Sequence, residues 1–295
     1  MIKYRYIVAL ILIIFIFNCY GQSKINNKSI FCCINSSKKS LKYLSSKDWD
    51  ILFPNRKGFT KNSIQNNTSD FYSYQTFVKA ASYFPKFLNE GDSLTQKREL
   101  AAFLAHIAQE TSDGWNDAPG GYFAWGLVYI EEQQKESIFN YVDSTNQIYP
   151  AVKGKLYFGR GPKQISWNYN YGQFSEFWYG SKDSLLNNPE RLATDQLLSF
   201  SSAIWFWMTP QTPKPSCHEV ITGLWKPNEK DLSNGRSIGF GNTLNIINGG
   251  LECGKGYDLL KSEYRYKYYE LFCKYLNVPI GENVKCTFQK PYGSE

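Results

Sequence analysis

Two acidic residues and one serine supply the side chains for acid–base chemistry. Glu110 ends a predicted amphipathic helix and is followed by Thr-Ser-Asp-Gly, and Glu132 follows a turn-rich stretch that contains Pro-Gly-Gly. Ser166 closes the segment Tyr-Phe-Gly-Arg-Gly-Pro-Lys-Gln-Ile-Ser at 157–166, whose glycines predict a turn carrying amide and hydroxyl groups. Two carboxylates on either side of a polar cleft are the minimum that hydrolysis of a glycosidic bond requires.

Helical periodicity predicts the elements that position these groups. Apolar residues recur at helical spacing from Leu94 to Glu110, and Ser93 with Gln96 matches a capping box at the start of this helix. A second helix, at about 195–208 with Thr194 as its N-cap, is apolar on nearly every face, which is typical of a buried central helix.

The remaining pattern is also helical. Further helical runs are expected at about 48–53, 74–83 and 257–276, whereas strand-like alternation is scarce and no internal repeat is present. The sequence therefore predicts a mainly α fold with at most one small β-hairpin, near Tyr157.

The first 21 residues have the pattern of a secretory signal peptide. Lys3 and Arg5 precede an apolar run at 7–17, which is too short for a confident membrane span, and a cleavage point lies before Gln22. We expect a secreted protein with a flexible lead at 22–44 and one folded domain at 45–295. Lipid attachment through Cys19 is the alternative.

Charge and ligand patterns narrow the function class. The net charge is +7, and removal of Lys3 and Arg5 with the signal peptide leaves +5. Basic residues are scattered, so no nucleic-acid-binding stripe is expected. His106 and His218 lie far apart and no C-x-x-C occurs, so we expect no metal site and no cofactor. We expect a monomer that has no membrane association after removal of the signal.

Several ordered motifs resemble glycoside hydrolase family 19, the chitinases known from plants and bacteria. The first matching segments are Ala-Ala-Phe-Leu-Ala at 101–105, Gln-Glu-Thr-Ser-Asp-Gly-Trp at 109–115 and Phe-Ala-Trp-Gly at 123–126. The segment at 157–172 follows, with Gly-Arg-Gly-Pro and then Trp-Asn-Tyr-Asn-Tyr-Gly. The last two are Ala-Ile-Trp-Phe-Trp-Met at 203–208 and Asn-Ile-Ile-Asn-Gly-Gly-Leu-Glu-Cys-Gly at 245–254. The resemblance extends from about Leu44 to Tyr292. It implies a two-lobed, lysozyme-like helical domain with a substrate cleft.

The resemblance also implies an activity and a set of site residues. The expected reaction is hydrolysis of β-1,4-linked N-acetylglucosamine polymers, with inversion at the anomeric carbon. Glu110 matches the general acid, Glu132 the general base, and Ser166 the hydroxyl that positions the water. The residues implied to contact sugar or support the site are Gln164, Tyr169, Asn170 and Asn248. Trp125, Trp167 and Tyr169 are our candidates for aromatic cleft walls.

Elementary electrostatics assigns the same roles. Inversion needs a neutral acid and a charged base about 6.5–9.5 Å apart, so that a water fits between them. We expect burial at the end of an apolar helix to raise the pKa of Glu110, and we expect Glu132 to be better hydrated and therefore charged. The choice of Glu132 over its neighbour Glu131 depends on the resemblance alone.

One departure from the family pattern concerns an arginine. Many members carry an Arg that pairs with the acid and with a glutamate matching Glu252. Ungapped counting places Tyr264 at that position, and we predict that Arg265 takes the role through a small shift.

Six cysteines remain once Cys19 is removed, and six cysteines allow 15 pairings. The resemblance implies a disulfide between Cys253 and Cys286. We expect Cys273 to be a buried free thiol. Whether Cys32 or Cys33 reaches Cys217 stays open.

Two other functions remain open at this point. A muralytic enzyme of the same fold would cut peptidoglycan, which also presents N-acetylglucosamine. A catalytically inert chitin-binding protein would keep the fold without turnover. The biological target and the number of subsites are not encoded in any recognisable pattern.

Overall fold

The computed structural model describes residues 41–57, 70–112, 117–133 and 141–294. Every described residue belongs to one compact unit, Ser37–Glu295. The predicted signal peptide at 1–21, nearly all of the lead at 22–44, and Cys32 and Cys33 lie outside the described residues. No helix in the described ranges has the length and apolar character needed to cross a membrane.

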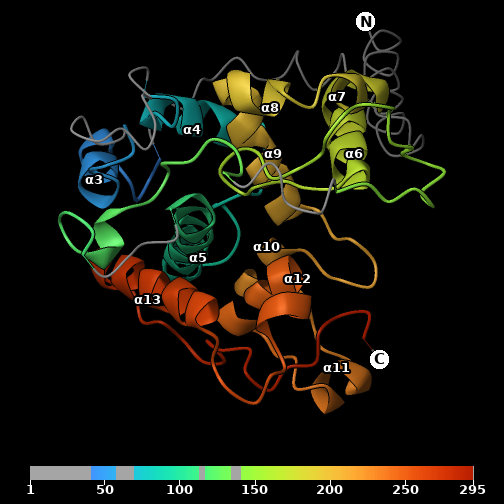
Figure 1. Cartoon of the computed structure of the whole chain (residues 1–295). Coiled ribbons are helices and arrows are strands. Elements are labelled where there is room, and N and C mark those ends of the chain that lie inside the picture. The colour runs from blue at the N-terminus through green and yellow to red at the C-terminus, as the bar shows by residue number, and fades with distance from the viewer. Residues whose placement is uncertain (1–40, 58–69, 113–116, 134–140, 295) are drawn as a thin grey trace, which may run out of the picture. The chain divides into compact units, whose positions relative to one another are not determined.

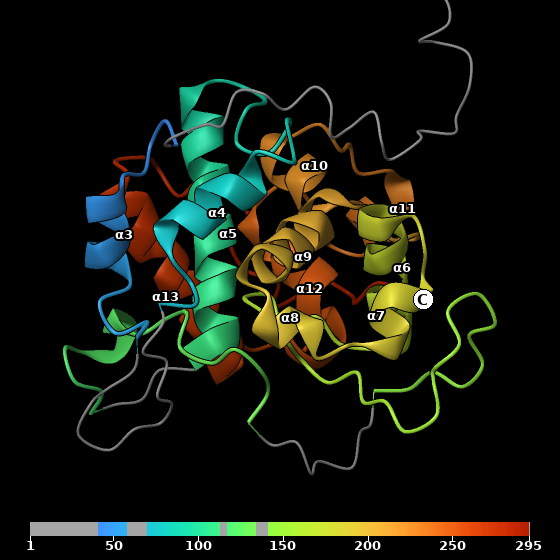
Figure 2. The ribbon, with the colours of Figure 1, turned by 90° about the horizontal axis from the view of Figure 1, so that it is seen from above.

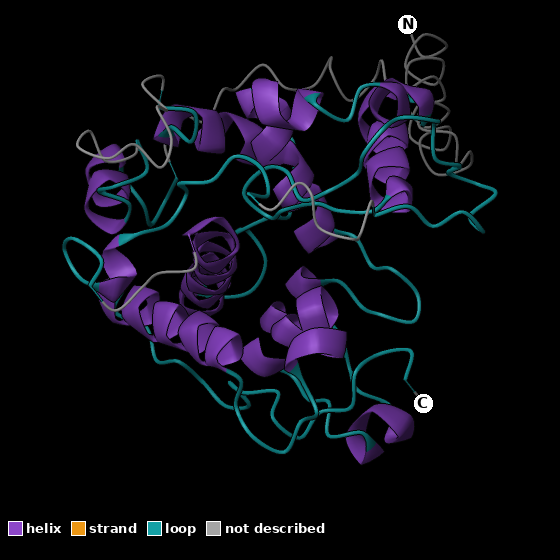
Figure 3. Cartoon of the chain, viewed as in Figure 1, coloured by secondary structure: helices purple, strands orange, loops and turns teal. Residues whose placement is uncertain are grey.

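The described residues form helices joined by loops (Figure 3). No strand occurs in these ranges, where pairing is limited to isolated antiparallel bridges at Glu131–Arg160, Arg160–Ile165 and Gln211–Lys214. The prediction of a mainly α fold is confirmed. Near Tyr157, where at most a small hairpin was expected, the pairing within the turn is the isolated bridge between Arg160 and Ile165. The helices are α3 (Ser46–Leu52), α4 (Tyr74–Ala81), α5 (Ser93–Ser112), the 3₁₀ turn η1 (Tyr122–Ala124), α6 (Asn168–Tyr179), α7 (Asp183–Asn187), α8 (Arg191–Thr194), α9 (Gln196–Met208), α10 (Cys217–Thr222), α11 (Glu229–Ser233), α12 (Phe240–Glu252) and α13 (Leu260–Tyr275).

Helix α5 organises the core. It packs along α13 and against α10, and Figure 2 shows it from the side, among α3, α4, α9 and α13. From Leu100 to Gln109 every side chain of α5 is buried, because the helix has neighbours on all sides. Helix α9 packs against α4, α8 and α10 (Figure 1) and is also largely buried, so the prediction of a buried central helix at 195–208 is confirmed.

The caps of these two helices differ from the sequence prediction by one residue. The side chain of Asp92, not Ser93, accepts from a backbone N–H of the first turn of α5, with Oδ1 2.8 Å from Thr95 N. Asp195, not Thr194, caps α9 in the same way. In both cases two good capping residues are adjacent, and residue type alone does not select between them.

A charged network lies in the core beside α5. His218 of α10 has Nδ1 2.6 Å from Glu99 Oε1 and Nε2 2.6 Å from Glu90 Oε2. Glu99 is fully buried and also accepts from Trp207 Nε1 and the backbone N–H of Leu88. Burial disfavours the charged imidazole, but the hydrogen bonds and charges of the two glutamates outweigh burial and raise the pKa of His218.

We predict that replacing His218 with Gln destabilises the fold by about 3–5 kcal/mol near pH 6, because it leaves Glu99 buried without its cation. Since the folded-state pKa of His218 is raised, the contribution of its charge is complete below the unfolded pKa and is lost as pH rises through the folded pKa. Denaturant unfolding at pH 6 and at pH 9 should therefore show a smaller difference between wild type and variant at the higher pH. A difference that grows with pH would contradict this account.

Candidate active site

A cavity of about 1080 Å³ contains most of the site residues expected from the sequence. Its walls come from the C-terminal end of α5, the segment at 129–133, the loop that leads into α6, and parts of α12 and α13. The expected residues that line it are Glu110, Glu132, Ser166, Gln164, Tyr169, Asn170, Asn248 and Arg265. Trp167, expected as an aromatic wall, lines it as well.

Glu110 lies between two cations. Lys163 Nζ and Arg265 Nη2 each lie 2.9 Å from Glu110 Oε1, and 17% of the Glu110 side chain is exposed. Burial favours the neutral carboxyl, but the charges of Arg265 and Lys163 outweigh it and lower the pKa of Glu110. The expectation of a raised pKa is therefore wrong for this structure, because it weighed burial alone. The predicted contact with Arg265 was not set against burial, and Lys163 was not anticipated.

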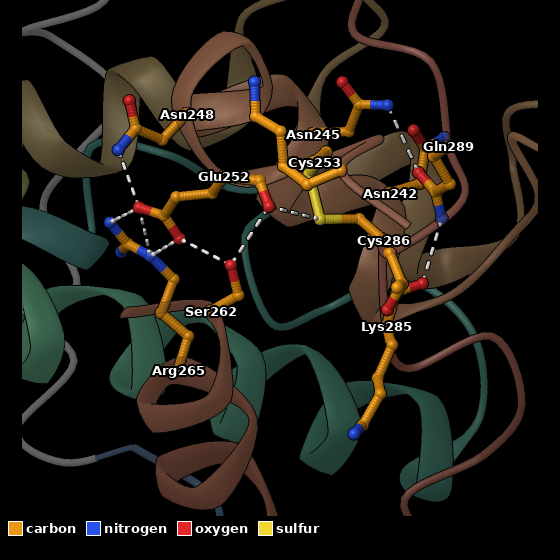
Figure 4. Close-up of a disulfide and its surroundings, with 12 residues drawn as sticks. Asn242, Asn245, Asn248, Glu252, Cys253, Ser262, Arg265, Lys285, Cys286 and Gln289 are labelled. Carbon is orange, nitrogen blue, oxygen red and sulfur yellow. Dashed lines mark hydrogen bonds and ion pairs between the residues drawn. A yellow bond between two sulfur atoms is a disulfide. The ribbon is translucent and has the colours of Figure 1, made fainter. Parts of the chain in front are cut away.

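Arg265 joins Glu110 to a buried glutamate behind the cavity wall. Its Nη2 lies 2.9 Å from Glu252 Oε1 and its Nε lies 2.9 Å from Glu252 Oε2 (Figure 4). Asn248 Nδ2 donates to Glu252 Oε1 at 2.6 Å, and the backbone of α12 departs from helical geometry at Asn248. The pairing of Arg265 with both acids, expected after a one-residue shift, is present. The two acids raise the pKa of Arg265 against the effect of burial, so the guanidinium stays charged.

Glu132 is held by neutral donors. Its Oε1 accepts from the hydroxyl of Tyr141 at 2.9 Å, and its Oε2 accepts from the backbone N–H of Gly159 at 3.2 Å. Burial, together with the hydrogen bond and charge of Glu132, raises the pKa of Tyr141 to about 12, so the phenol keeps its proton for donation. The neighbouring Glu131 instead pairs with Arg160, with 3.5 Å between Oε2 and Nε.

The turn at 159–167 places Ser166 beside the cavity. Gly161 and Gln164 both have positive φ, at 76° and 51°, and a Cβ on Gly161 would come within 2.9 Å of Ser199 Oγ. Ser166 Oγ donates to Gln164 O at 3.0 Å, which leaves oxygen lone pairs that can accept from a water. Asn170 Nδ2 donates to Ser166 O at 2.8 Å and fixes the turn against α6.

Trp125 does not line the cavity, in contrast to the expectation. Only 2% of its surface is exposed, it packs with Ala118 and Val128, and its Nε1 donates to Pro119 O. The indole therefore stabilises the loop that follows α5. The prediction was wrong because a tryptophan is equally suited to the wall of a cleft and to a small hydrophobic cluster, and the sequence does not distinguish these two positions.

Several cavity residues were not singled out from the sequence. Lys163 was read only as part of a turn, and Tyr141 belongs to no recognised motif, so their contacts with Glu110 and Glu132 come from tertiary packing alone. Asn170 Oδ1 accepts from Gln211 Nε2 at 3.2 Å, which brings a loop beyond α9 to the same wall. Other polar and aromatic lining residues not anticipated include Lys214, Lys261 and Phe206.

The predicted disulfide between Cys253 and Cys286 is confirmed (Figure 4). Cys253 directly follows Glu252, so the bond anchors the end of α12 next to the partner of Arg265. Cys273 is a buried free thiol, as expected, and Cys217 is another. Among the described residues no group of three His, Cys, Asp or Glu side chains could hold a metal ion.

These features define a class of protein. It is a mainly helical protein with a polar cavity lined by two carboxylates from separate segments. One carboxylate is paired with two cations and the other is held by neutral hydrogen-bond donors, an arrangement suited to acid–base cleavage of a polymer. Comparison with known proteins gives the family. The model of glycoside hydrolase family 19, described as chitinase class I, matches residues 52–286, and the chain belongs to this family.

Individual relatives are similar over most of their length. Endochitinase A2 of Pisum sativum is 48% identical over 224 residues, which cover 76% of this chain and 67% of the relative. Inactive chitinase-like protein 1 of Hevea brasiliensis is 49% identical over 223 residues, covering 76% of this chain and 69% of the relative. The crystal structure of chitinase C from Streptomyces griseus HUT6037 is 30% identical with a TM-score of 0.63, covering 83% of this chain and 97% of that chain.

Proposed function

We propose that this protein is an endo-acting chitinase that hydrolyses β-1,4-N-acetylglucosamine linkages by a single, inverting displacement. The observation that carries the proposal is that Glu110, Glu132 and Ser166 line one cavity, with the two acids in opposite surroundings. Glu110 is mostly buried and contacts cations, whereas Glu132 is held by a phenol and a backbone N–H. Similar proteins named endochitinases support the substrate and the endo mode.

In the proposed reaction one acid gives up a proton and the other takes one. Glu110 in its neutral form gives its proton to the glycosidic oxygen while the bond from the anomeric carbon to that oxygen breaks. A water positioned by Ser166 attacks the opposite face of the sugar, and Glu132 takes the proton that the water loses. Glu110 ends as a carboxylate and Glu132 as a neutral acid, and exchange with solvent restores both.

The remaining cavity residues bind and orient the sugar chain. Gln164, Asn170 and Asn248 line the cavity, and Tyr169 lies against Trp167 with ring centroids 6.1 Å apart and planes 16° apart. Amides can bind the N-acetyl and hydroxyl groups, and flat aromatic faces can pack on the apolar faces of sugar rings. We also propose that the chain is exported, with 1–21 as the signal peptide and 45–295 as the catalytic domain.

The configuration of the first product tests this proposal. We expect proton NMR of N-acetylglucosamine oligomers during early turnover to show the α-anomer at the newly formed reducing end, ahead of mutarotation. An initial β-anomer would reject the inverting mechanism. Parallel incubation with peptidoglycan tests the muralytic alternative, which predicts faster cleavage of cell wall than of chitin oligomers.

A second candidate function is binding of chitin without turnover. It is favoured by one observation, namely that the relative named an inactive chitinase-like protein is as similar to this chain as the relatives named endochitinases. The presence of both acids and of Ser166 at one cavity favours turnover. Binding of the oligomers with no release of new reducing ends would establish the inert function.

A further inference from the structure

Lys163 is a buried cation directed at the proposed acid. It lies in the turn between Gly161 and Ser166, its side chain is 7% exposed, and its Nζ is 2.9 Å from Glu110 Oε1. The ammonium also lies 5.4 Å from the centroid of the Phe206 ring on α9, which fixes the lysine from its other side. A lysine buried this deeply needs a counter-charge, and Glu110 supplies it.

Lys163 and Arg265 contact the same oxygen of Glu110. Arg265 divides its charge between Glu110 and Glu252, and its position is fixed by the bidentate contact with Glu252. Lys163 comes from a different segment of the chain, the turn at 159–167 that also contains Ser166. Because Oε1 accepts from two cations, the proton of the neutral acid is favoured on Oε2.

We propose that Lys163 is a positioning residue that sets the strength of the general acid. The inference rests on the proposed function and adds a role for a residue within it. Lys163 holds Oε1, directs the transferable proton to Oε2, and stabilises the carboxylate that Glu110 becomes once the proton has moved to the glycosidic oxygen. The result is a stronger acid that is protonated in a smaller fraction of molecules at neutral pH.

Other titratable side chains lie near Glu110 or line the same cavity, and a Lys163 variant leaves them in place. His106 on α5 is fully buried, and burial, with Arg265 and Lys163, holds its pKa well below the usual value, so it is neutral. Of the other charged side chains, Arg265 on α13 contacts Glu110 and also pairs with Glu252 on α12. The charged residues that line the same cavity are Lys261 on α13, Lys214 before α10, and Glu131 and Glu132 on the facing segment.

Removal of the Lys163 charge should move the alkaline side of the pH profile. The value of kcat/KM reports the free enzyme, and its alkaline limb falls as the general acid loses its proton. An opposite charge in contact lowers a carboxyl pKa by about 1–3 units. We expect Lys163→Met to shift the alkaline limb upward by about one pH unit, which is roughly a tenfold gain in kcat/KM on that limb. The value of kcat at the pH optimum should fall a few-fold, because the acid is weaker.

The experiment combines this pH profile with a measurement that does not need turnover. Carbon-13 NMR of protein labelled at the glutamate carboxyls identifies Glu110 as the resonance missing from Glu110→Gln. The Glu110 carboxyl should titrate higher in Lys163→Met than in wild type. Lys163→Arg keeps the charge, so the Glu110 titration and the alkaline limb of kcat/KM should both stay near wild type. Lys155→Met removes a cation that pairs with Glu190 away from the cavity, and it should leave both unchanged.

The outcomes separate this inference from the proposed function. If wild type hydrolyses chitin oligomers but neither the limb nor the Glu110 titration moves in Lys163→Met, the role of Lys163 is rejected while the chitinase function stands. If wild type does not hydrolyse chitin, the proposed function fails, and the titration alone then decides whether Lys163 controls the protonation of Glu110. Equal shifts in Lys163→Met and Lys163→Arg would show that the geometry of the turn, and not the charge, is responsible.

Discussion

Replacement of Glu110 with Gln is expected to lower kcat on N-acetylglucosamine oligomers by about 10²–10⁴-fold, the range for loss of a general acid. Gln has the shape of Glu, and its amide oxygen can accept from Lys163 and Arg265 as Oε1 does. It has no acidic proton to give to the leaving oxygen. Because the sugar is uncharged, the affinity for the oligomer should change little.

Two measurements distinguish loss of the acid from general damage to the site. Calorimetric titration with the oligomer should give a dissociation constant close to that of wild type. A dinitrophenyl glycoside, whose leaving group departs without a proton, should be cleaved by Glu110→Gln with a much smaller loss than the natural oligomer. Near-normal turnover of the oligomer by this variant would remove Glu110 from the role of acid. Equal losses on both substrates would indicate a structural role.

The sequence predicted the framework of this site because the framework depends on local pattern. Apolar spacing located α5 and α9 to within a few residues, and the mainly α class followed from the scarcity of alternation. The caps were misplaced by one residue because Asp92 and Ser93, and likewise Asp195 and Thr194, are all good capping residues. Only tertiary packing fixes where the first turn begins.

The electrostatics of the site could not be predicted from local pattern. Lys163 is 53 residues from Glu110 in sequence, and their ion pair exists because the turn at 159–167 folds back against the end of α5. That turn needs a positive φ at Gln164, which no residue-type rule anticipates for a non-glycine. The contact of Arg265 with Glu110, in contrast, followed from a family pattern that already reflects tertiary structure. The predicted direction of the Glu110 pKa shift was wrong because burial was weighed without the charges of Arg265 and Lys163.

The assignment of the general base to Glu132, and not to Glu131, leads to the second prediction of a large loss in kcat. Both side chains line the cavity, but Glu131 pairs with Arg160, whereas the two oxygens of Glu132 accept from Tyr141 and Gly159. We expect Glu132→Gln to lower kcat by about 10²–10⁴-fold, since a neutral amide cannot take a proton from water. Glu131→Gln is the matched control and should stay within about tenfold of wild type, because Gln keeps the shape of Glu and its amide oxygen can still accept from Arg160.

A small nucleophile that needs no base provides the decisive test of Glu132. Shortening this residue in Glu132→Ala opens space beside the anomeric carbon and removes the base, so turnover with water should fall as in Glu132→Gln. Azide is already anionic, so it should restore activity in Glu132→Ala and give a glycosyl azide of α configuration, the inverted product. A glycosyl azide of β configuration would indicate attack from the face that inversion excludes. Rescue by azide in Glu131→Ala, with none in Glu132→Ala, would reassign the base to Glu131.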